Sequence, residues 1–365
     1  MVSILKYIIL PVWTALFLSP SLTFRDETYR IAAEAGIPLL QVAYREGDSL
    51  TVFEVSTVPE ICPRADCFTV FQAASLSKPV MAYIIMKMAD RGEIDPDTPL
   101  IYYTQANRFT NRELAGRLTA RIVLSQTSGL PNWAASPGSS DWPDAPISFL
   151  FRPDSAFSYS GEAFAFLQRA VESIKGKGLE EIAREEVFIP LGMHASSYEW
   201  LCKYDTLAAD GYTREGENRG PGSFPRANAA YTLRTTAGDY MKFLIALNEG
   251  AGLSRQSRDA MFFPRVNAVR YPGHPRDCDR HVFWGLGLGI EKHGTLGEVV
   301  FHWGDNGRFK SLFLIIPKSK STPGRILVYF TNSEAGHDII KPLSFLFLGN
   351  EEPLAIHDWV LQQYK

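Results

Sequence analysis

Two residues with complementary chemistry stand one helical turn apart in the segment Ser75-Leu-Ser-Lys78. Residues three apart on a helix share one side, so the amine of Lys78 can reach the hydroxyl of Ser75. Such a pair is a nucleophile with its proton acceptor when burial lowers the pKa of the lysine. The spacing alone is weak evidence, because Ser3-Ile-Leu-Lys6 near the N-terminus repeats it.

The residues before Ser75 strengthen this interpretation. The segment Phe71-Gln-Ala-Ala leads from an apolar strand into a helix through small residues. We therefore expect Ser75 at the N-terminal end of a helix, where the helix dipole stabilises a developing oxyanion. The sequence has no Gly-x-Ser-x-Gly, His-Glu-x-x-His, P-loop or dinucleotide-binding glycine motif, so the Ser-Lys pair is the main candidate for chemistry.

Five ordered segments together resemble the class C β-lactamase-like serine hydrolases. That family includes serine β-lactamases, D-alanyl-D-alanine carboxypeptidases and esterases, and the resemblance covers roughly residues 30 to 345. Five motifs in order are a far more specific signal than any one of them. The segments are Phe71-Gln-Ala-Ala-Ser-Leu-Ser-Lys-Pro79, Leu124-Ser-Gln-Thr-Ser-Gly-Leu-Pro131, Phe157-Ser-Tyr-Ser-Gly161, Thr235-Thr-Ala-Gly-Asp239 and Phe301-His-Trp-Gly304.

The resemblance implies roles for three catalytic residues. Ser75 corresponds to the nucleophile that becomes acylated, and Lys78 corresponds to its partner. Tyr159 corresponds to the tyrosine that shares general-base duty in this family. A phenolate near the Lys78 ammonium is stabilised by its charge and can take the proton from Ser75, then activate water.

The resemblance also implies a substrate-binding and oxyanion strand. His302-Trp303-Gly304 stands where the family has a Lys-Thr-Gly-like triplet. Gly304 lets a substrate backbone approach the strand edge, and the N–H groups of Asp305 and Ser75 form the oxyanion hole. His302 either contacts the substrate or polarises the tyrosine. The alternative is a packed strand histidine with no catalytic task.

Two departures from the family pattern bear on the substrate. Gly161 stands where the tyrosine motif commonly ends in Asn, whose amide binds an acylamino side chain, and glycine cannot do this. His302 replaces the lysine that binds a β-lactam carboxylate, although some carboxypeptidases of the family also have His there. Both changes weaken the case for penicillins and peptidoglycan stems and leave the acyl-transfer residues intact. Gln126, where many relatives have His, is interpreted as structural.

Four aromatic side chains are candidates for an apolar acyl or alcohol pocket around the cleft, although each by itself is more typical of a core residue. They are Trp133, Trp142, Phe157 and Trp303.

The order of apolar patterns predicts which elements position these residues. Leu39 to Val55 alternates on both sides of Gly47-Asp48 and predicts a hairpin. Ser75 to Arg91 has helical spacing. Helical pieces that include Glu113 to Ser125 fill the middle, and strands return at Trp284 to Glu291 and beyond. The predicted fold class is α/β of the α+β type, with an antiparallel sheet built from both ends of the chain, flanking helices and an inserted, mostly helical lobe.

The predicted domain organisation has two parts. Residues 1–23 have the pattern of a signal peptide, because Lys6 precedes an apolar run too short to span a bilayer. Cleavage is expected after Thr23 or Ser21, and an uncleaved N-terminal anchor is the alternative. Residues 24–365 form the hydrolase domain, with the sheet region at about 24–94 plus 280–365 and the helical lobe at about 95–279.

Composition narrows the classes of partner. The 365 residues carry 37 Lys and Arg against 40 Asp and Glu, a net charge of −3 that offers no basic field for nucleic acid. The Cys278 segment has His at 274 and 281, but a closed zinc site needs four ligands, so we expect no metal. We expect no cofactor either, and a small ester, amide or peptide as substrate.

Four cysteines, Cys62, Cys67, Cys202 and Cys278, permit disulfides in an exported chain, with the pairing left open.

The sequence thus predicts an exported, periplasmic or extracellular serine hydrolase that cleaves an ester or amide through a Ser75 acyl-enzyme. Any membrane association is expected to be peripheral or through the N-terminus. Two alternatives stay open. One is a β-lactamase or D-alanyl-D-alanine carboxypeptidase, and the other is a non-catalytic binding or sensor module with the same fold.

Overall fold

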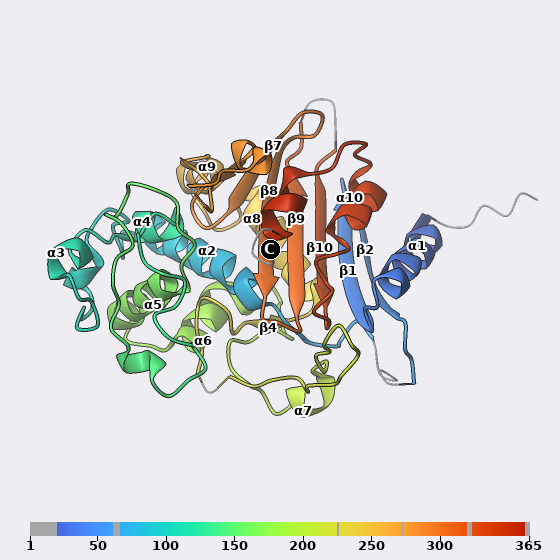
Figure 1. Cartoon of the computed structure of the whole chain (residues 1–365), viewed down its shortest axis with the longest axis horizontal. Coiled ribbons are helices and arrows are strands. Elements are labelled where there is room, and N and C mark those ends of the chain that lie inside the picture. Colours follow the sequence, from blue (N-terminus) through green and yellow to red (C-terminus); the bar gives the residue numbers. More distant parts are fainter. Residues whose placement is uncertain (1–19, 61–65, 225, 272, 320–322, 362–365) are drawn as a thin grey trace, which may run out of the picture.

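The computed structural model describes residues 20–60, 66–224, 226–271, 273–319 and 323–361. An eight-stranded sheet runs through the molecule in the order β2-β1-β10-β9-β8-β7-β6-β5, and every neighbouring pair is antiparallel (Figure 1). The strands are β1 (Leu39–Glu46), β2 (Ser49–Ser56), β5 (Val266–Asn267), β6 (Val282–Trp284), β7 (Gly289–His293), β8 (Gly297–Asp305), β9 (Lys310–Ile316) and β10 (Arg325–Thr331).

Strands from the N-terminal and C-terminal parts of the chain pair within this sheet, near its β2 edge. Strand β1 pairs with β10, which places Leu40 opposite Thr331. The hairpin of β1 and β2 turns at Gly47-Asp48, where Gly47 has a φ of +58° that favours glycine. The predicted hairpin and the predicted sheet built from both ends are therefore confirmed.

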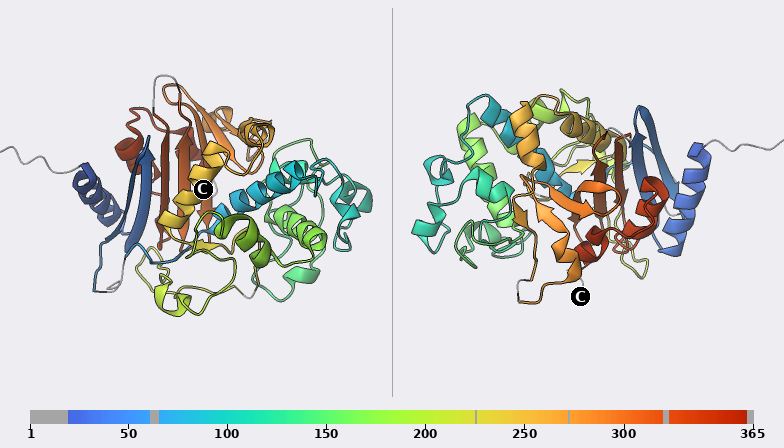
Figure 2. Two further views of the ribbon diagram at one scale, coloured as in Figure 1. Left: turned by 180° about the vertical axis from the view of Figure 1, so that it is seen from behind. Right: turned by 90° about the horizontal axis from the view of Figure 1, so that it is seen from above.

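Helices cover both faces of the sheet. Alternate residues of each strand point to opposite faces, so Leu312 and Leu314 pack on one side while Phe313 and Ile315 pack on the other. One side is covered by α1 (Pro20–Glu34), α10 (Ile340–Leu348) and α11 (Ala355–Leu361). The other side carries α8 (Ala237–Glu249), which lies in front of the strands in the left view of Figure 2, and α2 (Ser77–Asp90).

The helical lobe lies beside the sheet, and α2 runs from the sheet into it (Figure 1). It contains α3 (Arg112–Ala115), α4 (Ala120–Leu124), α5 (Gly161–Lys175), α6 (Leu179–Ala183) and a π-helical turn, Arg184–Phe188. Helix α7 (Tyr204–Leu207) lies below the large sheet in Figure 1, and β3 (Phe71–Gln72) pairs with β4 (Arg234–Thr235). The predicted lobe, residues 95–279, also contains α8, α9 (Arg255–Phe262) and β5. However, α8 packs on the large sheet and β5 pairs with it, so these two elements belong to the sheet region.

Two predicted elements are wrong in their extent. The predicted helix Glu113 to Ser125 is two short helices, because α3 ends at Ala115 and Thr119 caps the start of α4 through the N–H of Ile122. The predicted strand Trp284 to Glu291 is two strands, β6 and β7, with a turn at Gly287 (φ +80°). Gly285 permits this turn, since a Cβ there would lie 2.3 Å from the carbonyl oxygen of Met261.

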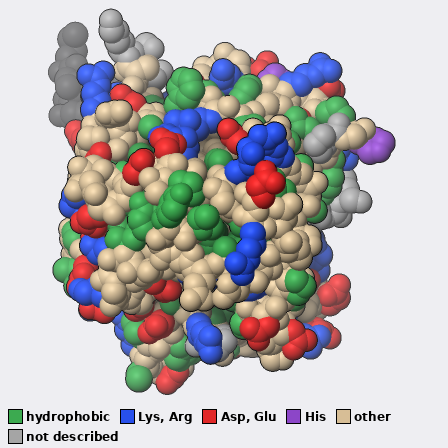
Figure 3. Space-filling model, turned by 90° about the vertical axis from the view of Figure 1, so that its left-hand side faces the viewer, with side chains coloured by type: hydrophobic (Ala, Val, Ile, Leu, Met, Phe, Trp, Pro, Cys, Tyr) green, Lys and Arg blue, Asp and Glu red, His purple; other side chains and the backbone are tan. Residues whose placement is uncertain are grey.

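Three of the four cysteines lie in the described residues. Cys67 and Cys202 are exposed and Cys278 is buried, and no disulfide joins any two of these three; Cys62 lies outside the described residues. Residues 1–19 of the predicted signal peptide also lie outside them. Within the described ranges, no helix has the length and apolar character needed to cross a membrane. Figure 3 shows acidic and basic side chains interspersed over the outer face of the helical lobe.

Candidate active site

Ser75 lies in a tight turn between β3 and α2. The turn is a 3₁₀ segment, Ala74–Leu76, so α2 begins at Ser77 and not at Ser75 as the sequence predicts. Ala74 has a φ of +50°, a conformation that costs energy in a residue other than glycine. Two buried tyrosines, Tyr240 and Tyr198, donate to the carbonyl oxygens of Leu76 and Ser77 at 2.8 and 2.9 Å. The backbone that carries the nucleophile is therefore held from several sides.

Lys78 contacts the nucleophile directly. Its Nζ lies 3.1 Å from the Oγ of Ser75 and donates to the carbonyl oxygen of Ala230 at 2.8 Å. The side chain is only 1% exposed. Burial lowers the pKa of Lys78 well below its usual value, because water no longer stabilises the ammonium form. This environment favours a neutral amine that can accept the proton of Ser75.

Tyr159 lies beside Ser75 and Lys78 as the third of the predicted catalytic residues. Its ring lies under the Nζ of Lys78, 4.8 Å from the ring centroid. The hydroxyl is buried and has no hydrogen-bond partner in the part of the chain that the structure describes. Burial raises the pKa of the Tyr159 phenol, and the Ser75 hydroxyl and the Arg270 charge offset part of this rise. Tyr159 and Ser75 line one cavity, so the structure brings Ser75, Lys78 and Tyr159 together.

The segment that carries Tyr159 is fixed by Gln126. The carbonyl oxygen of Gln126 accepts from the N–H of Ser158, and its side-chain Oε1 accepts from the N–H of Ser160, both at 2.8 Å. Gln126 itself has a φ of +57° and is fully buried. Gln126 therefore positions the segment that carries Tyr159. This agrees with the structural role that the sequence predicts for it.

His302 lies behind the cleft and not on its surface. It is fully buried, and its Nδ1 lies 2.8 Å from the carbonyl oxygen of Trp303. Burial and the nearby Lys78 hold the pKa of His302 well below its usual value. Its ring centroid lies 6.1 Å from that of Tyr159. The buried position leaves no surface for substrate contact. It agrees with both other interpretations of His302, an influence on Tyr159 or a packed histidine with no catalytic task.

Gly304 is required for packing of β8 against the nucleophile turn. A Cβ at Gly304 would lie 2.3 Å from both the carbonyl oxygen of Ala73 and the Oγ of Ser311. The sequence predicts that this glycine admits the substrate backbone, whereas its close neighbours are the protein's own atoms. The absence of a Cβ thus lets the end of β8 approach Ser75.

Asp305 lies at the end of β8, beside Ser75. Pairing of β7 with β8 ends at Phe301, so β8 continues to Asp305 without β7 beside it. Asp305 lines the cleft together with Ser75, as an oxyanion role for its N–H requires. Its carboxylate lies 2.6 Å from the Nζ of the buried Lys310, which offsets a negative charge that would oppose a developing oxyanion.

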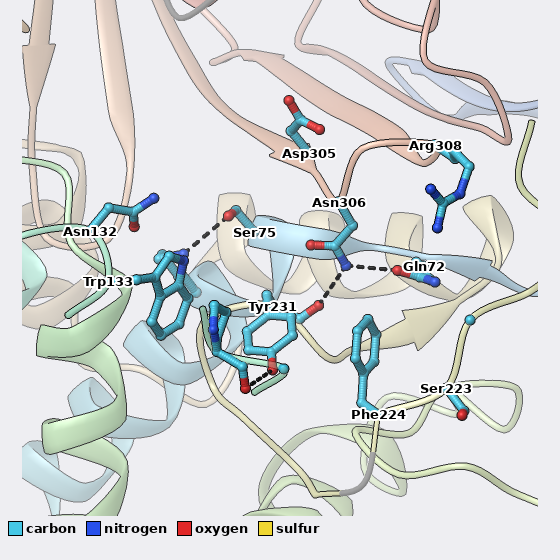
Figure 4. A pocket seen from close by; sticks show the side chains of 14 residues that line it. Gln72, Ser75, Asn132, Trp133, Ser223, Phe224, Tyr231, Asp305, Asn306 and Arg308 are labelled. Atoms are coloured by element: carbon cyan, nitrogen blue, oxygen red, sulfur yellow. Dashed lines mark hydrogen bonds between the residues drawn. The ribbon is translucent and has the colours of Figure 1, made fainter. Parts of the chain in front are cut away.

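The cleft divides into two cavities that share Ser75, Asn132 and Asp305. The first, about 380 Å³, is seen in Figure 4 with Trp133 and Asn132 on one side of Ser75 and Asn306 and Arg308 on the other. Its remaining wall includes Gln72, Phe224 and Tyr231. The second, about 420 Å³, is lined by Tyr159, Arg270 and Trp303 in addition to the shared residues.

Trp133 explains the glycine at the end of the tyrosine motif. A Cβ at Gly161 would lie 2.3 Å from the Cζ2 of Trp133, so the indole occupies the space that an asparagine side chain would need. Tyr231 and Trp142 pack edge-on against this indole, with ring centroids 5.5 and 5.8 Å away. The side chain of Asn132 accepts from the N–H of Gly161 at 2.9 Å.

The predicted aromatic pocket is only partly formed. Trp133 and Trp303 line the cavities. Phe157 packs in the core against Trp284 and Trp359, and Trp142 donates to the buried Glu162 at 2.6 Å behind Trp133. Neither of these two belongs to the cavity walls.

Sequence reasoning missed Asn132, Arg270 and Asn306 as residues of the cleft. Asn132 directly follows the Leu124–Pro131 motif, and Asn306 follows Asp305, so proximity to a motif is a usable signal for both. Arg270 lies in the connection between β5 and β6, far from every motif, and nothing in the sequence marks it.

Comparison with known proteins places the chain in a family. The sequence profile of the Beta-lactamase family matches residues 30–342, so the chain belongs to that family. Penicillin-binding protein 4 of Amycolatopsis lactamdurans is 30% identical over 138 residues, which are 35% of this chain and 36% of that protein. The putative penicillin-binding protein PbpX of Bacillus subtilis (strain 168) is 25% identical over 205 residues, 54% of this chain and 51% of that protein. The chain thus spans a third to a half of the length of these relatives.

Solved structures show the same fold. A D-stereospecific amidohydrolase from Streptomyces sp. superposes with a TM-score of 0.71 at 17% identity, covering 90% of this chain and 99% of that one. The D-alanine carboxypeptidase AmpC from Burkholderia cenocepacia gives a TM-score of 0.72 at 14% identity, covering 90% and 98%. The predicted fold class and the predicted family are confirmed.

Proposed function

We propose that this protein is a serine hydrolase that cleaves an ester or amide bond through an acyl-enzyme on Ser75. The observation that carries the proposal is the 3.1 Å contact between the Nζ of the buried Lys78 and the Oγ of Ser75, in a cleft that Tyr159 also lines. A serine hydroxyl within hydrogen-bond distance of a buried amine that can take its proton is the arrangement that acyl transfer requires.

Burial shifts the pKa values of the two proton carriers, Lys78 and Tyr159, in opposite directions. It lowers the pKa of Lys78 and raises that of Tyr159, so the resting pair is a neutral amine and a neutral phenol. Lys78 then accepts the proton of Ser75 as Oγ bonds to the carbonyl carbon. Tyr159 donates a proton to the leaving group as the scissile bond breaks. The resemblance alone implies a tyrosine that works as a phenolate base, and burial favours the acid role.

Hydrolysis of the acyl-enzyme uses the same groups in reverse. Water attacks the acyl carbonyl and gives its proton to the Tyr159 phenolate. The Lys78 ammonium then returns a proton to the Oγ of Ser75 as the bond between that oxygen and the acyl carbon breaks. The N–H groups of Ser75 and Asp305 stabilise the oxyanion in both halves. The residues of this chain supply every step without a cofactor.

Substitution of the nucleophile tests this proposal. Ser75→Ala should lower the hydrolysis of a p-nitrophenyl ester by at least about 10⁴-fold, because the covalent route is lost. The matched control is Ser148→Ala, an exposed serine away from the cleft, which should keep wild-type activity. Thermal unfolding of both variants shows whether the fold is intact. Wild-type activity in Ser75→Ala would remove this serine from the mechanism.

A second candidate is hydrolysis of a β-lactam or a D-alanyl-D-alanine peptide. The fold shared with a D-alanine carboxypeptidase and a D-stereospecific amidohydrolase favours it, whereas Trp133 at the place of the acylamide-binding asparagine opposes it. Turnover of nitrocefin and stable labelling by a fluorescent penicillin would support this candidate over a plain esterase. The absence of both, with p-nitrophenyl esters hydrolysed, would exclude it.

We also propose that the protein is exported, on the evidence of the apolar run Tyr7–Leu18 behind Lys6. Mass spectrometry of the N-terminal peptide from protein recovered outside the cytoplasm should show cleavage after Ser21 or Thr23. A protein retained in the cytoplasm with residues 1–23 intact would contradict export.

A further inference from the structure

Gln72 is a buried polar side chain that the proposed mechanism does not use. It is the last residue of β3, shortly before Ser75 in the chain, and it is 4% exposed. Its Nε2 donates to the carbonyl oxygen of Pro221 at 2.7 Å, and its Oε1 accepts from the Nδ2 of Asn306 at 2.8 Å. Figure 4 shows the contact between the two amides beside the first cavity. Gln72 therefore links three parts of the cleft wall: the strand before the nucleophile, the loop at Pro221 and the turn after β8.

The partners of the two amides fix which way each amide points. The carbonyl oxygen of Pro221 can only accept, so the Nε2 of Gln72 faces it and the Oε1 is left for Asn306. Arg234 donates to the same carbonyl oxygen at 3.0 Å and holds it in place. Asn306 directs its Nδ2 to two acceptors, the Oε1 of Gln72 and, at 3.2 Å, the carbonyl oxygen of Tyr231. The side chain of Asn306 is therefore held in one orientation.

This contact lies next to the second N–H group of the oxyanion hole. Asn306 directly follows Asp305, whose N–H completes the oxyanion hole in the proposed function. Gly304, the residue before Asp305, packs closely against the carbonyl oxygen of Ala73. Gln72 and Ala73 are neighbours in the segment that leads to the nucleophile. The end of β8 is thus tied to that segment on both sides of Asp305, which fixes the separation of the two oxyanion N–H groups.

We propose that Gln72 is a positioning residue for the oxyanion hole, which holds the N–H of Asp305 toward the reacting carbonyl by fixing Asn306. This inference rests on the proposed function. An N–H group stabilises the transition state only when it lies within hydrogen-bond distance of the oxygen on which charge develops. Loss of the Gln72 contact frees the turn after β8, so the rate of the chemical steps falls while binding of the substrate changes little.

Replacement of Gln72 by a side chain of similar length without hydrogen-bonding groups tests the proposal. Gln72→Met should lower kcat for p-nitrophenyl phenylacetate about tenfold. Acylation and deacylation use the same oxyanion hole and should slow together, so KM should stay within about twofold of the wild-type value.

Gln41→Met is the matched control. Gln41 is also buried and also bonds to two backbone groups, those of Asp66 and Ala237, but it lies on β1, outside both cavities of the cleft. Thermal unfolding should show that both variants lose stability, whereas Gln41→Met should keep the wild-type kcat. A wild-type kcat in Gln72→Met, or an equal loss of kcat in the two variants, would overturn the proposal.

A double-mutant cycle tests whether Gln72 acts through Asn306. Asn306→Ala removes the same contact from the other side and should lower kcat by a similar factor. The double variant Gln72→Met with Asn306→Ala should be no slower than the slower single variant, because one contact can be lost only once. Losses that multiply would show that the two side chains act independently and would contradict the proposal. Asn306 is half-buried, so Asn306→Ala keeps the proposal testable if Gln72→Met does not fold.

Benzylboronic acid reports on the oxyanion hole without turnover. Its boron takes the place of the acyl carbon of phenylacetate. A bond forms between the Oγ of Ser75 and the boron as the serine proton passes to Lys78, and the product is a tetrahedral anion that resembles the transition state. The inhibition constant should rise about tenfold in Gln72→Met and Asn306→Ala and stay unchanged in Gln41→Met. An unchanged constant in Gln72→Met would overturn the proposal. Ester hydrolysis that continues in Ser75→Ala would instead defeat the proposed function itself, which is a distinct result.

Discussion

The two walls of the cleft differ in how they relate to the family pattern. The wall at the start of α2 keeps its small set of reacting groups, Ser75 and Lys78 with Tyr159 beside them, held by buried hydrogen bonds to backbone and side chains. The rest of the cleft carries bulky aromatic side chains at positions where the family pattern has polar recognition groups, with Trp133 against Gly161 and Trp303 in the β8 triplet.

The difference indicates that the residues that break the bond and the residues that recognise the substrate are under different constraints, even where they share an element. A change in a reacting group loses the reaction, whereas a recognition wall can be repacked if its volume is conserved. At Gly161 the lost asparagine side chain is balanced by the indole of Trp133. At the β8 end of the cleft, Arg270 of the β5–β6 connection lines the cavity beside Trp303.

The largest effect is expected at Lys78, among the reacting groups. Lys78→Met removes the proton acceptor and should lower kcat/KM for p-nitrophenyl esters by about 10³-fold. Because burial lowers the pKa of Lys78, wild-type kcat/KM should reach its plateau well below pH 10.5, where an ordinary lysine titrates. A pH–rate profile from pH 5 to 11 measures both. A rise centred near pH 10.5 would contradict the neutral amine.

A Tyr159 variant separates nucleophilic attack by Ser75 from departure of the leaving group. Tyr159→Phe removes the acid for the leaving group, so hydrolysis of an amide or alkyl ester should fall by about 10²-fold or more. A p-nitrophenyl ester should fall less, since p-nitrophenolate leaves without a proton. The measurement is the kcat of the wild-type protein and of Tyr159→Phe on each of two substrates that share the same acyl group. An equal loss for both would show that Tyr159 does not act on the leaving group.

The smallest effect is expected in the repacked wall. Gly161→Asn forces a side chain onto the Trp133 indole and should lower the free energy of unfolding by about 1–3 kcal/mol. The double variant Gly161→Asn with Trp133→Ala removes the collision and should recover part of that stability. Denaturant unfolding of the wild-type protein, Gly161→Asn, Trp133→Ala and the double variant forms a double-mutant cycle. Additive losses, with no recovery, would show that the two side chains do not share this space.

The sequence allowed the framework and the reacting pair to be predicted. Strand alternation on both sides of Gly47-Asp48 reflects one buried face, and it located the hairpin correctly. The spacing of Ser75 and Lys78 is a local property of a helical turn, so their contact follows from the sequence. Tyr159 is far along the chain, and only the family resemblance connected it to this pair.

Features that depend on tertiary contacts could not be predicted. The split between β6 and β7 depends on Gly285 meeting the backbone of Met261, a contact that no local pattern contains. Arg270 lies in a connection without periodicity, and its place is fixed by Trp303 and Trp359. The tight fit of Gly304 against the nucleophile turn likewise appears only when β8 and that turn are seen together.

Covalent labelling with a fluorophosphonate, read by intact mass and peptide mapping, tests the central claim most directly. An activated serine in an open cleft attacks the phosphorus, so wild-type protein should gain one adduct, located on Ser75, and Ser75→Ala should gain none. Labelling should also weaken in Lys78→Met, because the proton acceptor is gone. A folded wild-type protein that takes up no label, or takes it up on another residue, would contradict the account.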